Sequence, residues 1–141
     1  MAHTTTHHDE QMLQAHPRGS DLDRTALLSC LQACLDCAQT CVSCADACSA
    51  ESDPKMLARC IRLNNDCADL CCATARILSR QTEPEALIVR AAVEACATAC
   101  GVCAAECEHH GKRMEHCRIC AEACRTCESA CRTLATAKAR A

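Results

Sequence analysis

The sequence predicts an all-α protein: an antiparallel up-down-up-down four-helix bundle with a Cys-lined core. Two observations predict this fold. Four helix-sized segments are separated by short breaks, and no segment has the alternating, β-branched pattern of a strand. In three of these segments cysteines recur every three or four residues, which places them on one face of a helix.

The composition indicates that cysteine itself forms the core. Leu, Ile and Val together supply only 20 of the 141 residues and there are no aromatic residues, whereas the chain has 27 Ala and 19 Cys. The net charge of −3 is too small to indicate a disordered chain. Because a protonated thiol packs as a small hydrophobic group, such an array can line an interior and the metal-free chain can fold.

The first two helices have start signals at capping residues. Ser20 or Asp21 is expected to cap the first helix, which runs to about residue 50. The sequence Ser52-Asp53-Pro54 then offers a cap and a first-turn proline for the second helix. The break between these helices is therefore very short.

The third helix is expected to begin at a capping box formed by Thr82 and Glu85 around Pro84, and Gly111 suits its C-terminal end before the fourth helix starts. All three connections are short. Sequential helices joined by short connections lie antiparallel to each other, which gives the up-down-up-down topology.

One domain is expected, with residues 20–141 forming the bundle and residues 1–19 a His-containing arm or a short extra N-terminal helix. Gln11, Met12, Leu13 and Ala15 are compatible with such a helix. The arm also carries histidines, which we expect to be solvated.

The cysteines of the first, third and fourth helices follow the heptad rhythm of residues that a bundle turns inward. Over 18 residues, such a stripe spans about 27 Å, most of the length of the bundle. These three stripes comprise Cys30, Cys34, Cys37, Cys41, Cys44 and Cys48 in the first helix, Cys96, Cys100, Cys103 and Cys107 in the third, and Cys117, Cys120, Cys124, Cys127 and Cys131 in the fourth.

The second helix departs from the pattern. It carries Cys60, Cys67, Cys71 and Cys72, and its inward register passes through Asn64, where a cysteine would continue the series. The Asn64 side chain can be a weak ligand, a hydrogen-bond partner or a residue that fixes helix register. Cys72 is out of phase, so we expect it at the edge of the bundle, where it binds metal peripherally or not at all.

The two ends of the bundle differ. Branched aliphatic residues are expected to close one end, which we call the aliphatic end: Leu27, Leu28, Ile77, Leu78, Leu87, Ile88 and Leu134. The other end, the histidine end, gathers soft and borderline ligands: Met56, His109, His110, Met114 and His116, next to Cys48, Cys60, Cys107 and Cys117. His110 and Met114 extend the inward stripes, whereas His109 and His116 also suit solvated turns.

Thiolates select soft cations, and charge discriminates among these cations. Zinc held by four thiolates keeps a double negative charge, so several such sites in one narrow interior would repel each other. One Cu(I) per thiolate is neutral, and bridging thiolates allow about one ion per cysteine. We therefore expect multiple Cu(I) ions per chain, a number in the high teens.

Other partner classes are disfavoured. The chain has no basic stripe and no aromatic platform for nucleic acid, and we expect no run of apolar residues long enough to span a membrane. The N-terminus lacks the apolar segment of a secretory signal, so a cytoplasmic location is expected if the chain is complete. Thiols stay reduced in that compartment, which favours metal binding over disulfides.

The chain resembles the cytosolic bacterial branch of the four-helix-bundle copper storage proteins over about residues 20–138. The segments that carry the resemblance are CLQACLDCAQTCVSCADAC, CADLCC, CATACGVCAAEC and CRICAEACRTCESAC. The resemblance implies storage of many Cu(I) ions, uptake through the His- and Met-containing end, and a homotetramer. A copper chaperone is a candidate partner. The candidate ligands are the nineteen cysteines together with Asn64, Met56, Met114, His109, His110 and His116.

Three alternative roles of the cysteines remain open. The cysteines can form an inert core, a thiol redox protein built on CxxC pairs, or a zinc or iron-sulfur site. The redox alternative lacks the expected βαβ context. No nucleophile-base pair and no phosphate-binding glycine loop is present, so we do not expect an enzyme.

Overall fold

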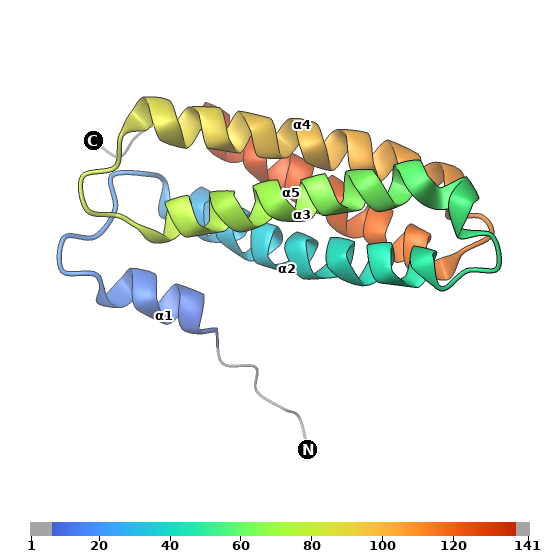
Figure 1. The fold of residues 1–141 in the computed structure, drawn as a ribbon. Coiled ribbons are helices and arrows are strands. Elements are labelled where there is room, and N and C mark those ends of the chain that lie inside the picture. The colour runs from blue at the N-terminus through green and yellow to red at the C-terminus, as the bar shows by residue number, and fades with distance from the viewer. Residues whose placement is uncertain (1–6, 138–141) are drawn as a thin grey trace, which may run out of the picture.

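The computed structural model describes residues 7–137 and contains no strand within that range. The helices are α1 (His8–Ala15), α2 (Arg24–Ser49), the 3-10 helix η1 (Pro54–Leu57), α3 (Ala58–Ser79), α4 (Ala86–His110) and α5 (Glu115–Thr136). Helices α2 to α5 form an antiparallel four-helix bundle (Figure 1). The expected all-α fold with a short extra N-terminal helix is confirmed.

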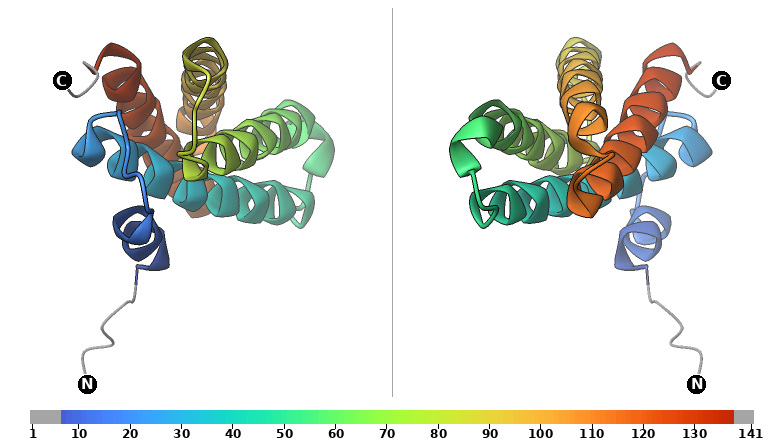
Figure 2. Two further views of the ribbon diagram at one scale, coloured as in Figure 1. Left: turned by 90° about the vertical axis from the view of Figure 1, so that its left-hand side faces the viewer. Right: turned by 90° about the vertical axis from the view of Figure 1, so that its right-hand side faces the viewer.

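The four long helices contact one another in a closed ring. Contacts join α2 to α3, α3 to α4, α4 to α5, and α5 back to α2. Figure 2, which looks along the bundle from each end, shows the α3–α4 connection at one end and the α2–α3 and α4–α5 connections at the other. Every helix therefore turns one face to a common interior, and the two ends differ in the loops that border them.

Helix α2 begins later than expected, because Asp23 caps it. The Asp23 side chain accepts a hydrogen bond from the Ala26 backbone N–H at 2.8 Å. Ser20, one of the two expected caps, instead donates its hydroxyl to Gln81 Oε1 at 2.6 Å. The prediction of Ser20 or Asp21 was therefore wrong by two or three residues, since an aspartate closer to the helix supplies the acceptor.

The second helix starts with a tighter turn than expected. Pro54 opens η1, and α3 begins at Ala58. The Asp53 side chain makes no capping hydrogen bond. Pro54 fits its expected role as a first-turn residue, but the turn that it opens is 3-10 rather than α-helical.

The expected capping box of α4 does not form. Glu85 is the N-cap and accepts from the Leu87 backbone N–H at 3.3 Å, while Thr82 hydrogen-bonds to His16. At the other end of α4, Gly111 is the C-cap with a right-handed backbone, φ −64°. A Cβ there would lie 3.2 Å from the Arg118 Cα, so the glycine permits the close approach of α5.

The segment around α1 packs against the aliphatic end of the bundle. Leu13 and Leu22 contact the core as partly buried residues. Gln81, which is 6% exposed, bonds to Ser20 and donates to the Leu78 carbonyl at 2.7 Å. Within the arm expected over residues 1–19, the described part thus contains a helix that contacts α2, and His3 lies outside the described residues.

The aliphatic end is built partly from other residues than expected. Leu27, Leu78 and Leu134 are buried as predicted, but Leu87 is 75% and Ile88 58% exposed. Leu28 and Ile77 are half-buried. The inward stripe of α4 runs back from Cys96 by three residues to Val93, which is 1% exposed, so Leu87 and Ile88 lie off this register.

Within residues 7–137, two helices are apolar and long enough to cross a membrane by length and composition alone, Arg24–Ser49 and Ala86–His110. The expectation that no segment reaches that length was wrong, because alanine and cysteine raise the hydropathy of both helices. Both belong to the bundle, and their cysteine faces are buried in it. Such helices are common in protein cores, so this is weak evidence for a membrane span.

Candidate metal centre

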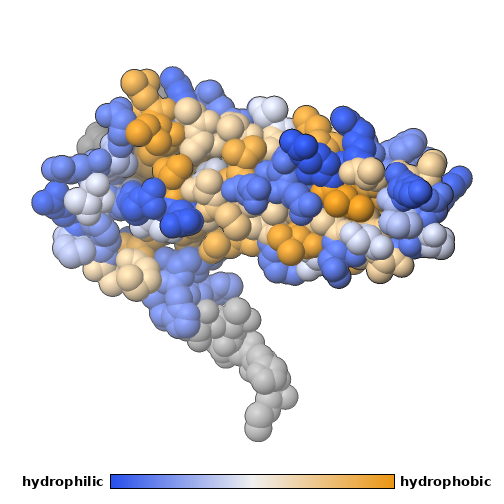
Figure 3. Space-filling view, in the orientation of Figure 1, coloured by the Kyte–Doolittle hydropathy of each residue, from blue (hydrophilic) through white to orange (hydrophobic). Residues whose placement is uncertain are grey.

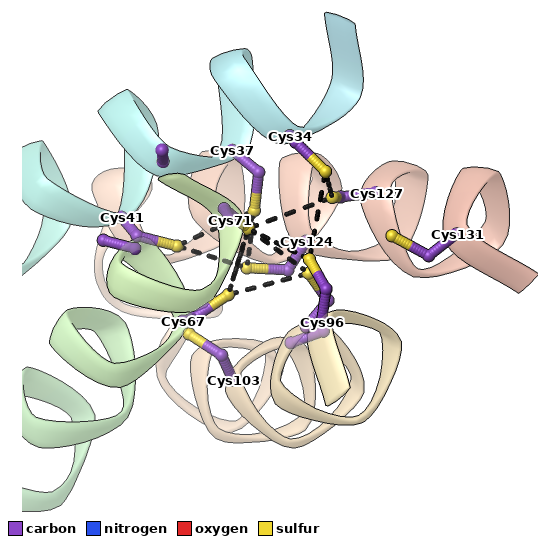
Figure 4. Close-up of a cluster of buried hydrophobic side chains, with 14 of the residues drawn as sticks. Cys34, Cys37, Cys41, Cys67, Cys71, Cys96, Cys103, Cys124, Cys127 and Cys131 are labelled. Carbon is purple, nitrogen blue, oxygen red and sulfur yellow. Dashed lines mark hydrogen bonds between the residues drawn. The ribbon is translucent and has the colours of Figure 1, made fainter. Parts of the chain in front are cut away.

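The interior of the bundle is lined by thiols. Eighteen of the nineteen cysteines are buried, all nineteen are free, and Cys72 alone is exposed. Figure 4 shows cysteine side chains from the four long helices pointing toward one another. The cysteine spacing produces this arrangement, because cysteines spaced alternately by three and four residues stay on the face that their helix turns to the interior.

The thiols form overlapping groups of four in which all the sulfur atoms lie within 4.8 Å of one another. Each of the five groups named next combines residues from three helices. Five of these groups are Cys34/Cys96/Cys127/Cys131, Cys37/Cys41/Cys67/Cys124, Cys37/Cys67/Cys71/Cys100, Cys41/Cys103/Cys120/Cys124 and Cys44/Cys48/Cys60/Cys117.

Neighbouring groups share members. Cys37, Cys41, Cys67 and Cys124 each belong to two of these groups. The Cys41 and Cys124 sulfurs lie 3.6 Å apart, and those of Cys37 and Cys124 3.7 Å apart. A shared thiolate can bridge two metal ions, so the geometry suits a continuous cluster better than separate sites.

Asn64 lies inside the array and is fully buried. Its Nδ2 donates to the Cys60 carbonyl at 2.9 Å, and its Oδ1 accepts from Cys120 at 2.9 Å and from Cys103 at 3.3 Å. The inward register of α3 therefore brings an amide oxygen among the sulfurs at the position where a cysteine would continue the series.

His116 is the histidine that reaches the thiols. Its Nδ1 lies 3.4 Å from the Cys44 sulfur, 3.5 Å from Cys117 and 4.0 Å from Cys48. The solvated-turn interpretation of His116 was wrong, because α5 begins at Glu115 and the helix directs this ring toward the array.

The other residues of the histidine end lie farther out. His110 continues the α4 stripe, yet its Nε2 bonds to Glu106 Oε1 at 3.2 Å. His109 is exposed, Met56 is 75% exposed and Met114 is half-buried. These four residues line an open groove of about 980 Å³ at this end. No hydrogen bond joins any of these four described residues to a thiol, in contrast to His116.

The pKa values of the thiols are shifted in both directions along the array. Hydrogen bonding with Cys131 lowers the pKa of Cys30 from 9.0 to about 5, and hydrogen bonding with Cys100 lowers the pKa of Cys127 to about 7. At the histidine end, burial raises the pKa of Cys117 to about 11 and also raises that of Cys48. Neighbouring thiols thus lower the pKa of some cysteines in the array, and burial raises that of others.

Glu51 is a further contributor that the sequence pattern did not single out. Glu51 Oε1 accepts a hydrogen bond from His116 Nε2 at 2.9 Å, which orients the ring. A signal was present, because Glu51 follows Cys48 by three residues and so continues the α2 stripe into the connection.

This arrangement defines a class of protein. A bundle filled with adjacent free thiols, and with imidazole and amide groups at the same array, is suited to hold many soft metal ions rather than one. The class is that of metal-thiolate storage bundles.

The comparisons with known proteins agree with this class. Residues 23–136 match the family model described as copper storage protein. A comparison with curated proteins yields no match. Among solved structures, the Streptomyces lividans copper storage protein Ccsp loaded with 10 copper equivalents is 46% identical, with a TM-score of 0.90, over 92% of this chain and 99% of that chain.

Two further structures are similar. A cytosolic copper storage protein from Streptomyces lividans, with five coppers, is 52% identical with a TM-score of 0.78, over 79% of this chain and 93% of that chain. A Cu(I)-bound copper storage protein, BsCsp3, is 34% identical with a TM-score of 0.68, over 76% of this chain and 95% of that chain. The chain belongs to the copper storage protein family, and its function is the storage of copper.

Proposed function

We propose that the buried cysteines of α2 to α5 hold Cu(I) as a continuous, bridged thiolate cluster, on the order of one ion per cysteine. The observation that carries this proposal is the sharing of Cys37, Cys41, Cys67 and Cys124 between four-sulfur groups. Isolated sites for zinc or iron-sulfur clusters would keep their ligands separate, and thiolate-held zinc would accumulate negative charge in the core.

X-ray absorption at the copper edge of the anaerobically loaded protein tests this ligand set. Bridged ions lie close together, so we expect a sulfur shell and a copper-copper shell in the same spectrum. A sulfur shell with no copper neighbour at full loading would contradict a bridged cluster.

Uptake is proposed to take place at the histidine end. The groove lined by Met56, His109, His110 and Met114 lies at this end, and His116 contacts thiols there. At the aliphatic end Leu27, Leu78 and Val93 are all at most 1% exposed. His116→Ala should slow Cu(I) uptake while leaving the final capacity almost unchanged. An equal rate in the variant would remove His116 from the proposal.

Asn64 and Cys72 have different proposed roles. The Asn64 Oδ1 is close enough to Cys103 and Cys120 to supply an oxygen ligand to copper held by these thiols. Cys72 is exposed and belongs to α3 outside the inward register, so it is assigned a peripheral role at most. Storage is a non-enzymatic role, and this is the role proposed for the array.

A cytoplasmic location and a copper chaperone that delivers Cu(I) are also proposed. Free thiols persist in a reducing compartment, and one similar structure is described as a cytosolic protein. Fractionation of cells should recover the protein with cytosolic markers, and a Cu(I)-loaded chaperone should transfer its ion to the reduced protein. Recovery in a membrane fraction would contradict the location.

The assembly is proposed to be a homotetramer. Exposed hydrophobic side chains lie on the outer faces of the long helices, including Leu35, Val42, Val102 and Ile119. Figure 3 shows hydrophobic residues over the first turns of α4, where Leu87 and Ile88 are exposed. Such residues suit contacts between bundles. Sedimentation analysis should give four times the 15.1 kDa chain mass, and a monomer at micromolar concentration would contradict it.

A further inference from the structure

Glu51 and His116 come from different parts of the chain and meet at the histidine end. Glu51 lies in the connection between α2 and η1, whereas His116 is in the first turn of α5. Glu51 Oε1 and His116 Nε2 are 2.9 Å apart, and the two side chains are 37% and 25% exposed. The contact is thus partly shielded from solvent and lies directly beside the Cys44 and Cys117 thiols.

The hydrogen bond decides which ring nitrogen of His116 is free. A carboxylate can only accept, so the His116 Nε2 must carry the proton. In the neutral imidazole the Nδ1 lone pair is then free, and Nδ1 is the atom that lies 3.4 Å from Cys44 and 3.5 Å from Cys117. Carboxylates commonly orient metal-binding histidines in this way.

Two glutamates near this end are engaged with other groups. Glu106 bonds to His110 and pairs with Arg59, and Glu108 pairs with Arg125. Among the described residues, Glu51 is the carboxylate that contacts His116. Asp53 lines the same groove and makes no ion pair with a described histidine, which makes it a matched control for charge.

We propose that Glu51 is a positioning residue: it holds His116 with Nδ1 unprotonated and directed at the thiols, and thereby speeds the transfer of the first Cu(I) ions into the array. The inference rests on the proposed role of His116 in uptake. Beyond that role, the inference states that Glu51, which forms no hydrogen bond with a thiol, orients the His116 ring.

Nitrogen NMR of the reduced, metal-free protein tests the positioning directly. At about pH 8 the His116 ring should be the Nε2–H tautomer in the wild type. His116→Ala identifies the signal among the seven histidines. Glu51→Ala should shift it toward a mixture of tautomers, whereas Asp53→Asn should leave it unchanged. A wild-type tautomer in Glu51→Ala overturns the inference.

Stopped-flow transfer of one equivalent of Cu(I) from a coloured chelator complex tests the consequence. Loss of such a partner typically weakens a metal site 10- to 100-fold, so Glu51→Ala should slow transfer by about tenfold at unchanged final capacity. Asp53→Asn should match the wild type. If His116→Ala is slow and Glu51→Ala is fast, His116 keeps its role and the Glu51 inference fails. If His116→Ala is itself fast, both fail.

Discussion

The amide oxygen of Asn64 lies 2.9 Å from the sulfur of Cys120, so an oxygen acceptor stands among the thiols of the interior. The Asn64 Nδ2 also donates a hydrogen bond to the Cys60 carbonyl, one turn earlier in α3, at 2.9 Å. This side chain therefore links α3 to α5 in the metal-free protein and borders the thiols that are proposed to hold copper.

Removing the Asn64 amide should weaken the metal-free fold. Asn64→Ala deletes a buried hydrogen-bonding group, and we expect a loss of about 1–3 kcal/mol in the free energy of unfolding. Asn64→Cys restores the thiol series and should raise the Cu(I) capacity by about one. Chemical denaturation and metal counting measure the two effects. An unchanged count in a correctly folded Asn64→Cys protein would contradict the placement of residue 64 in the array.

Truncation at the aliphatic end should affect stability without affecting storage. Leu27 is fully buried, so Leu27→Ala should cost about 2–5 kcal/mol in the free energy of unfolding while leaving the copper count unchanged. Leu87→Ala removes the same atoms from a side chain that is 75% exposed. Measured at a dilution at which the chain is monomeric, it should change stability by no more than about 0.5 kcal/mol. Equal losses in the two variants would show that this end is assigned to the wrong residues.

The metal-free protein should lose stability as the pH falls from 9 toward 5. The pKa values of Cys30 and Cys127 are lowered from 9.0 to about 5 and about 7 in the folded chain, so above pH 9 their contribution is fully present. This contribution to folding stability is lost as the pH falls from 9 through the pKa values of the folded chain, because the unfolded chain binds more protons than the folded chain in that range.

Urea denaturation under reducing conditions at several pH values measures this slope. Burial raises the pKa of Cys117 to about 11 in the folded chain. The contribution of Cys117 to folding stability is therefore present below pH 9 and is lost as the pH rises from 9 to 11. The profile should therefore peak near pH 9. Cys127→Ser should flatten the limb between pH 7 and 9, whereas Cys72→Ser should not. A wild-type profile without a slope between pH 5 and 9 would be inconsistent with thiolates in the core.

Cys72 should be the thiol that reacts in the native, metal-free protein. It is exposed, whereas the other eighteen cysteines are buried. Brief treatment with iodoacetamide should add one label, located at Cys72 by mass spectrometry, and none in Cys72→Ser. Cys72→Ser should also keep a near wild-type copper count. Rapid labelling of many thiols would mean that the core opens to solvent in the metal-free state.

The sequence predicts the interior well, because the spacing of three and four residues fixes which face of a helix carries the thiols. It also places Asn64 and Val93 in the inward register, although the contribution of Val93 was overlooked in favour of Leu87 and Ile88. Cys72 lies outside this register, and the structure leaves it exposed.

Contacts that depend on long-range geometry could not be predicted. His116 lies one residue before the inward position of Cys117, and only the approach of α5 to α2 shows that its ring reaches Cys44. The pairing with Glu51 joins residues 65 positions apart. The caps at Asp23 and Glu85 were missed because several polar residues compete at each break, and tertiary partners such as Gln81 occupy Ser20.

The most direct test of storage on the inward thiols is an anaerobic titration of the fully reduced protein with Cu(I) against a chelating competitor, with bound copper per chain counted by elemental analysis. A bridged array predicts saturation in the high teens, about one ion per cysteine. Saturation at four or five ions would contradict it and would indicate separate four-thiol sites.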